Sequence, residues 1–267
     1  MVDRVVRVRA AALTPPVSRF REMIQIMKTG YLLLIVITLS VIPAYSRSDD
    51  LLTKFTAETD QVRKEQLLNE IVRRPDAGPT LLRVAMNPNN ILTKWMSIRG
   101  IGMVKYGKAV PFLIHSLADQ DPYVRANAAR ALGEIKDTSA SLDLIRLLGH
   151  EKDGGVIEQT SLALRMLGAK AAVPGLKKVA PHPSSQTRCW VLQAIGTLGS
   201  KQDVPFLAKY LYDASDFVDR CAAQAVEEIT GQDFGLPRQS GLTDPRQGID
   251  RARRWWETSK ASFPNRE

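Results

Sequence analysis

The chain has 267 residues, and 44% of them are hydrophobic, which is ordinary for a folded protein of one or two domains. Its formal net charge is +9, but part of the basic excess lies in the first 46 residues, so the rest of the chain is only mildly positive. A mild positive charge does not indicate a protein that binds nucleic acid.

An apolar segment at 31–43 follows a short basic stretch that begins at Met27, and it ends in Ala44-Tyr45-Ser46. This order is typical of a secretory signal peptide and predicts cleavage after Ser46. The apolar run is shorter than the roughly 20 residues that a membrane span needs. An uncleaved inner-membrane anchor at 31–43 is the alternative.

Residues 1–26 are rich in arginine and make an unusually long start for a signal peptide, so Met27 competes with Met1 as the true start. We assign 1–46 to an N-terminal extension and signal peptide. We therefore expect an exported protein, periplasmic or secreted, which meets a membrane only through the signal segment if that segment is uncleaved.

The stretch from Asp121 to Ile135 reads as a capped amphipathic helix, and the same design recurs about every 31 residues. Asp121 suits the N-cap, and Pro122 suits the first helical position. Two columns agree in all five copies: the cap column Asn90, Asp121, Asp153, Ser184, Ser215 and the small-residue column Gly100, Ala131, Ala163, Ala194, Ala225. A shorter helix precedes each later copy, with leucines at Leu113, Leu144, Leu176 and Leu207.

This pattern predicts an all-α fold, a right-handed α-solenoid of about five two-helix repeats over residues 78–231. In such a stack each helix pair buries the apolar face of its neighbour. The small-residue column lets adjacent helices approach closely, so a bulky residue there should push two repeats apart.

Asp121–Ile135 matches throughout the motif Asp-Pro-x-Val-Arg-x-x-Ala-Ala-x-Ala-Leu-Gly-x-Ile. Through this motif the chain resembles the short HEAT-like repeat family, whose repeats are also found in phycobilisome lyases. Together with the signal segment, the resemblance suggests an exported bacterial HEAT-repeat protein. It implies a solenoid used as a binding surface. The family's arginine column reads Lys94, Arg125, Ile157, Arg188, Asp219, so an Asp–Arg ladder would be broken at the third and fifth copies.

The ends of a solenoid need atypical helices to cover their apolar faces. Residues 48–77 are expected to form the N-terminal cap, with an amphipathic piece made of Val62, Leu67, Leu68, Ile71 and Val72. Residues 232–267 are expected to form a loop and a C-terminal capping helix. Trp255 and Trp256 on that helix are interpreted as the lid on the last repeat, and an exposed aromatic docking site is the alternative.

No nucleotide-binding loop, nucleophile motif or Cys-x-x-Cys pair occurs in the sequence, so we expect no enzyme, no cofactor and no metal. The glycines fall instead at helix ends such as Gly168 and Gly199, where a left-handed cap favours them. One polar row, Asp119, His150, His182 and Asp213, holds metal-ligand residue types. Stacked repeats are roughly 10 Å apart and Zn–N bonds measure about 2 Å, so two adjacent histidines could share an ion only if their side chains converged strongly. We interpret the row as solvated turn residues, and a metal site is the alternative.

Cys189 and Cys221 are the two cysteines, and an even number in an exported chain permits a disulfide. They fall one register out of line on neighbouring helices, so their Cα separation is expected to strain or exceed the 7 Å limit. The register argues against a disulfide without excluding one.

The longer helix of each repeat should present one face away from its shorter partner. We call this face the inner face and define it by nine candidate binding residues. They are Trp95, Arg99, Arg130, Glu158, Leu162, Arg165, Gln193, Arg220 and Gln224. Arginine and tryptophan commonly anchor interfaces, and three arginines form a basic stripe on the N-terminal half. An acidic peptide or loop of another protein is the expected partner. An ordinary solvated helix surface is the alternative.

The resulting hypothesis is a non-catalytic protein-interaction scaffold of the cell envelope that binds its partner on the concave face of the solenoid. The second hypothesis is a chromophore- or ligand-handling protein similar to the phycobilisome lyases that share this repeat. Visible absorbance of purified material would favour the second hypothesis.

Overall fold

The computed structural model of this chain describes residues 50–236 and 245–263. The predicted signal segment 31–43, its cleavage point and the competing start Met27 lie outside the described residues, as does part of the predicted C-terminal loop, 237–244.

The chain divides into two compact units, Met1–Thr53 and Lys54–Glu267. Of the first unit the structure describes only 50–53, which are helical. The second unit contains the repeats.

The second unit alternates two sets of helices, which we call A and B helices. The A helices are α3 (Ala77–Met86), α5 (Val110–Ser116), α7 (Ser141–His150), α9 (Val173–Val179) and α11 (Val204–Lys209). The B helices are α4 (Ile91–Met103), α6 (Pro122–Ile135), α8 (Gly154–Met166), α10 (Ser185–Leu198) and α12 (Asp216–Thr230). Short 3-10 turns lead into four of the A helices. Helices α2 (Gln61–Ile71) and α13 (Pro245–Ser259) flank the repeats.

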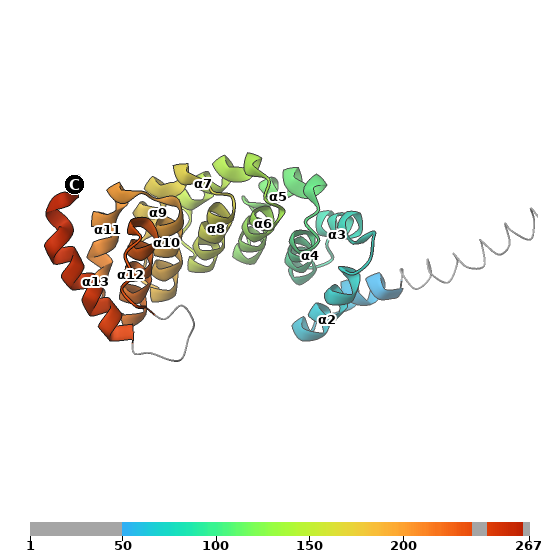
Figure 1. Ribbon diagram of the computed structural model, residues 1–267. Helices are drawn as coiled ribbons and strands as arrows, with labels where there is room; N and C mark the ends of the chain where they lie inside the picture. Colours follow the sequence, from blue (N-terminus) through green and yellow to red (C-terminus); the bar gives the residue numbers. More distant parts are fainter. Residues whose placement is uncertain (1–49, 237–244, 264–267) are drawn as a thin grey trace, which may run out of the picture. The chain divides into compact units, whose positions relative to one another are not determined.

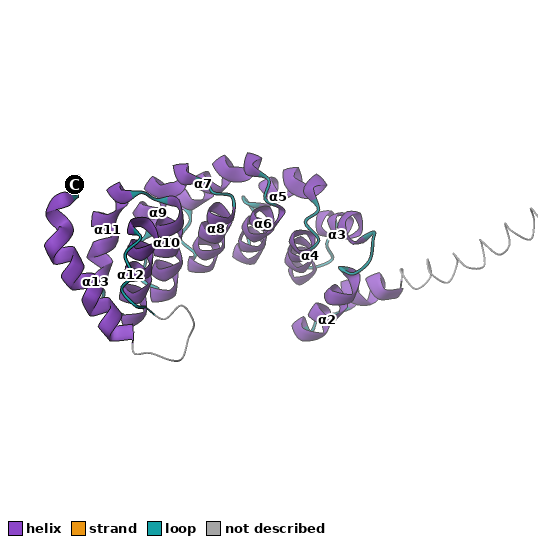
Figure 2. Cartoon of the chain, in the orientation of Figure 1, coloured by secondary structure: helices purple, strands orange, loops and turns teal. Residues whose placement is uncertain are grey.

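Each B helix packs on the next B helix along the chain, and α5, α7 and α9 lie along one side of the B helices (Figure 1). Figure 2 shows helices and loops throughout the described part of the second unit. The predicted all-α solenoid of five helix pairs is confirmed for this unit. Among the described helices, none has both the length and the apolar character to cross a membrane.

The B helices begin where the cap column places them. The side chains of Asn90, Asp121, Asp153 and Ser184 each accept a backbone N–H from the first turn of the helix that follows. Such caps satisfy amides that have no partner inside the helix. Ser215 occupies the same column but makes no side-chain cap hydrogen bond.

The helix ends agree less well with prediction. Gly168, one residue beyond the C-cap of α8, has φ of +65°, and Gly231, at the C-cap of α12, has φ of +74°, both in the left-handed region that favours glycine. Gly199 was expected to do the same at the end of α10, but its backbone is extended, with φ of −79°. At the end of α6 the left-handed residue is Lys136, with φ of 62°.

Glycines set the distance between neighbouring B helices. A Cβ added to Gly133 of α6 would lie 2.7 Å from Ala163 Cα, and one added to Gly196 of α10 would lie 2.8 Å from Ala225 Cα. Gly102 of α4 stands in the same relation to Ala131. These approaches are closer than real Cβ atoms allow, so three of the four B–B joins depend on a glycine opposite an alanine.

Ion pairs connect the first turn of a B helix to the A–B turn of the following repeat, where an A–B turn is the segment between an A helix and the next B helix. The pairs are Lys94 with Asp119, Arg125 with Glu151, and Arg188 with Asp213. As the family column implied, the third copy has no such pair, because it carries Ile157 and faces His182. At the fifth copy Asp219 pairs instead with Arg253 of α13, at 3.0 Å.

The N-terminal helix α2 docks differently from its predicted amphipathic pattern. Val62, expected in the core, is 66% exposed, whereas Lys64 is completely buried. The Lys64 ammonium donates to Glu58 O at 2.7 Å and to Thr93 Oγ1 at 2.6 Å, which connects α2 to α4. Burial lowers the pKa of Lys64, and the charge of Glu58 partly opposes that shift.

At the other end, α13 packs on α12. Ile249 and Ala252 are buried there, and Arg253 donates to Leu211 O at 2.7 Å in addition to its pair with Asp219. Trp255 and Trp256 are half-buried and form a cluster of aromatic rings with Phe234 and Phe263. The ring centroids of Trp255 and Phe234 are 5.6 Å apart, and those of Trp256 and Phe263 are 5.7 Å apart.

Candidate ligand-binding surfaces

The nine residues of the inner face lie on all five B helices. Trp95 and Arg99 lie on α4, Arg130 on α6, Glu158, Leu162 and Arg165 on α8, Gln193 on α10, and Arg220 and Gln224 on α12. All are at least partly exposed. They form a row of separate positions rather than one enclosed cavity; Gln224 lines an acidic hollow of about 510 Å³ with Glu227 and Glu228.

The expected basic stripe is partly neutralised by the protein itself. Arg99 Nη2 lies 2.8 Å from Glu65 Oε1 of α2, and Arg130 Nε lies 2.8 Å from Glu134 Oε1, one turn along α6. Both guanidinium groups therefore already have a carboxylate partner. Of the three arginines in the stripe, Arg165 is the one for which the described residues offer no carboxylate within ion-pair distance.

Aromatic rings that the sequence analysis did not single out complete this face. Tyr123 stacks on Trp95, with ring centroids 6.2 Å apart. The Arg165 guanidinium lies 5.9 Å from the ring centroid of Trp190, and the Arg220 guanidinium lies 5.5 Å from that of Phe217. Tyr123 and Phe217 occupy one column of the repeat, two residues after the cap, and that column was the available signal.

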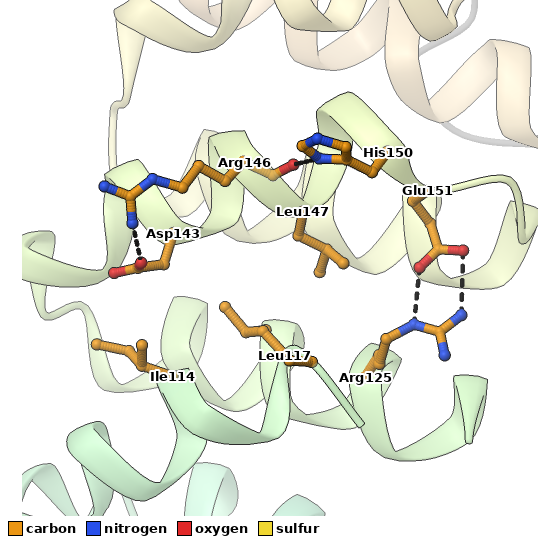
Figure 3. A pocket seen from close by; sticks show the side chains of 9 residues that line it. Ile114, Leu117, Arg125, Asp143, Arg146, Leu147, His150 and Glu151 are labelled. Carbon is orange, nitrogen blue, oxygen red and sulfur yellow. Dashed lines mark hydrogen bonds and ion pairs between the residues drawn. The ribbon is translucent and has the colours of Figure 1, made fainter. Parts of the chain in front are cut away.

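A hollow of about 460 Å³ lies on the other side, between α5 and α7. Figure 3 shows the side chains that line it. Ile114, Leu117 and Leu147 supply apolar walls. Two ion pairs border it. Arg146 pairs with Asp143 at 2.6 Å, and Arg125 forks onto Glu151 at 2.8 and 3.1 Å.

These border charges are well satisfied. Burial of the Glu151 carboxylate acts to raise its pKa, but hydrogen bonds from Arg125 and from the backbone N–H groups of Asp153 and Lys152 outweigh it, so the pKa lies below its ordinary value. The charged groups at the border are thus already paired with one another, while Ile114, Leu117 and Leu147 offer apolar contact.

The polar row proposed from sequence was wrong at one position. Glu151, not His150, occupies the place equivalent to Asp119 and Asp213, because α7 carries one extra residue before the turn. His150 Nδ1 instead lies 2.8 Å from the carbonyl oxygen of Arg146 on its own helix. The described residues contain no group of three or more metal-ligand side chains near enough to share an ion.

The register argument against a disulfide was wrong. Cys189 of α10 and Cys221 of α12 are bonded, with Cα atoms 5.4 Å apart, inside the usual range. Cys189 is 3% exposed and Cys221 is 1% exposed, so both lie in the seam between the helices rather than on the inner face. The close Gly196–Ala225 contact at the same join brings the two backbones within reach.

Comparison with known proteins identifies the repeats. Residues 78–165 match the family model described as HEAT repeats. The chain is 33% identical over 115 residues to a bilin biosynthesis protein, PecE, of Mastigocladus laminosus, which covers 43% of each chain. It is 33% identical over 132 residues to the phycocyanobilin lyase subunit alpha of a Nostoc species, covering 49% of this chain and 41% of the relative.

Two solved structures share the fold. One is the complex of CpcE and CpcF of phycocyanin lyase from Nostoc, with a TM-score of 0.50 and 20% identity over 76% of this chain and 92% of that one. The other is an engineered protein, also with a TM-score of 0.50 and 20% identity, over 68% of this chain and 97% of that one. At this identity the two structures support the fold alone.

These relatives correct the functional prediction. Both curated relatives are named for bilin chemistry, which contradicts the cell-envelope scaffold and favours the second hypothesis, that of chromophore handling. The scaffold hypothesis gave more weight to the apolar segment 31–43 than to the repeat type. The chain spans less than half the length of either curated relative. Residues 78–165 thus match HEAT repeats, and somewhat less than half of the chain is similar to a bilin biosynthesis protein and to a phycocyanobilin lyase subunit.

Proposed function

We propose that this protein is a subunit that binds an open-chain tetrapyrrole, a bilin, and acts together with another protein. The observation that carries the proposal is the 33% identity to two proteins, one named as a bilin biosynthesis protein and the other as a phycocyanobilin lyase subunit. One of them is named as a subunit, and the solved structure of similar fold is a complex of two proteins. Both facts favour a protein partner.

The inner face has the chemistry that such a ligand requires. A bilin is a flat conjugated chain of four rings that carries two propionate carboxylates. Aromatic side chains offer flat apolar surfaces, and guanidinium groups bind carboxylates through two parallel hydrogen bonds. Trp95, Trp190 and Phe217 supply the rings, and Arg165 and Arg220 lie beside two of them.

The role that we assign to this chain is to bind and orient the chromophore, which is a part of a lyase reaction rather than the whole of it. The two cysteines are joined in a disulfide, so in this state neither provides a thiolate nucleophile. We expect bond formation to the acceptor to require the partner protein.

The test is direct binding of phycocyanobilin to the purified chain with its disulfide intact. We expect a one-to-one complex with an affinity on the order of micromolar and an induced circular-dichroism signal in the visible region, because a chiral protein surface fixes the flexible chromophore. The urea-unfolded chain serves as the control for non-specific binding. An absence of induced signal at ligand concentrations well above the micromolar range would contradict the proposal.

The compartment is a second part of the proposal, and we place the protein outside the reducing cytoplasm. Two observations support this: the apolar segment 31–43 and the buried Cys189–Cys221 disulfide, because stable disulfides are rare in reducing compartments. N-terminal sequencing of the protein from its native cells is expected to begin at Arg47. A native chain that still carries residues 31–43 would be inconsistent with cleavage.

A further inference from the structure

The join between α8 and α10 differs from the other three B–B joins. At those joins a glycine of one B helix lies against an alanine of the next. At the equivalent position α8 carries Arg165, opposite Ala194. The two helices cannot approach as closely at this level, because an arginine side chain needs the space that glycine leaves free.

The same join also lacks the ion pair that connects the neighbouring turns. The third repeat has Ile157 where the second has Arg125 and the fourth has Arg188. His182, in the acidic position of the following turn, contacts backbone groups instead, with its Nδ1 accepting from Ser184 N at 3.1 Å. The glycine contact and the ion pair of the neighbouring joins are therefore both replaced here, and a hydrogen bond from Thr187 Oγ1 to Glu158 Oε1, at 2.8 Å, connects the two helices instead.

Arg165 is half-buried at this join, and part of its side chain stays accessible to a ligand. Its guanidinium lies over the ring of Trp190, which comes from α10 on the opposite side of the join. Arg99 and Arg130 are bound by Glu65 and Glu134, whereas among the described residues no carboxylate pairs with Arg165. A guanidinium that is held against an indole but lacks a counter-ion has its hydrogen-bond donors free in one plane.

We propose that Arg165 and Trp190 form the subsite that holds one propionate of the bilin. This inference rests on the proposed function and deepens it. The guanidinium binds the carboxylate through parallel hydrogen bonds, and the indole supports the adjoining pyrrole ring. Recognition of the propionate carboxylate is thereby assigned to Arg165 and not to Arg99 or Arg130, which already have carboxylate partners.

The test compares phycocyanobilin with its dimethyl ester, which keeps the conjugated chain and removes both negative charges. Arg165→Gln is expected to weaken binding of the free acid about tenfold and to leave binding of the ester unchanged within about twofold, because only the acid offers a charged partner. Arg165→Lys keeps the charge without the fork and should recover part of the loss. Trp190→Leu is expected to weaken both ligands to a similar extent.

Arg146→Gln is the matched control, because that arginine lies on α7, outside the inner face, and already pairs with Asp143; this variant should bind both ligands as the unaltered chain does. An unchanged thermal midpoint of Arg165→Gln establishes that the fold is intact. Equal affinity of Arg165→Gln and the unaltered chain for the acid would overturn this inference while the proposed function stands. Equal weakening for acid and ester would overturn it too. If the unaltered chain binds neither ligand, both proposals fall.

Discussion

Loss of the Cys189–Cys221 disulfide is expected to lower the free energy of unfolding by about 3–4 kcal/mol. The bond joins residues 32 positions apart, and closing a loop of that length removes conformational freedom mainly from the unfolded chain. Both sulfur-bearing side chains are buried between α10 and α12, so the bond also fixes the join next to the C-terminal cap. Urea unfolding followed by far-ultraviolet circular dichroism, with and without reductant, measures the difference.

The double variant Cys189→Ala/Cys221→Ala separates the bond from the reductant. It should unfold near the midpoint of the reduced protein, and added reductant should not move its midpoint further. Equal midpoints for the oxidised and reduced chains would show that the bond adds nothing to stability. Free thiols in the protein purified under oxidising conditions would be a stronger contradiction, because the bond would then be absent.

The repeat pattern predicted the solenoid because the interactions that define the pattern act within one helix or between neighbouring repeats. A cap residue such as Asp121 acts on amides two and three residues away, and the small column acts on the neighbouring repeat about 31 residues on. The unusual α8–α10 join was also readable in principle. The column that holds Gly133 and Gly196 contains Arg165 at the third copy, and this break in the pattern is visible without a structure.

Which arginines of the inner face already have a carboxylate partner could not be predicted in the same way. Arg99 is neutralised by Glu65, which lies 34 residues earlier on α2, outside the repeats. The docking of α2 itself departs from a simple amphipathic pattern, because Lys64 is buried through hydrogen bonds to Glu58 and Thr93. Which cations of the inner face stay available thus depends on side chains from elements without periodicity.

The disulfide shows the limit of register arguments. Helical columns place Cys189 and Cys221 one position apart along their helices, a shift of about 1.5 Å in rise. That shift is small beside the allowed range of Cα separations, and the close glycine contact between α10 and α12 compensates for it. Inter-helix distance, which sequence columns do not report, decided the outcome.

Replacement of Arg253 by methionine is expected to destabilise the C-terminal cap by about 2 kcal/mol at neutral pH. Asp219 is 2% exposed, and the Arg253 guanidinium contacts its carboxylate at 3.0 Å and Leu211 O at 2.7 Å. Removal of one partner leaves a buried charge uncompensated, and the partial exposure of Arg253 keeps the expected cost below that of a fully buried pair. The fluorescence of Trp255 and Trp256 on α13 reports release of the cap during urea unfolding.

The pH dependence of the stability lost in Arg253→Met tests whether the buried charge of Asp219 causes that loss. Burial raises the pKa of Asp219, and the charge of Arg253 opposes that shift, so the pKa should rise further in Arg253→Met. A carboxyl group whose pKa is raised by folding adds stability below its unfolded pKa and loses it as the pH rises through the folded value. The penalty of Arg253→Met should therefore be small near pH 4 and full near pH 7.5.

Two further variants serve as controls. Asp219→Asn in the same chain should recover most of the stability lost in Arg253→Met, whereas Arg254→Met, at an exposed neighbouring position, should have little effect. A penalty that is equal at both pH values, or that Asp219→Asn fails to relieve, would mean that lost packing and not the buried charge weakens the cap.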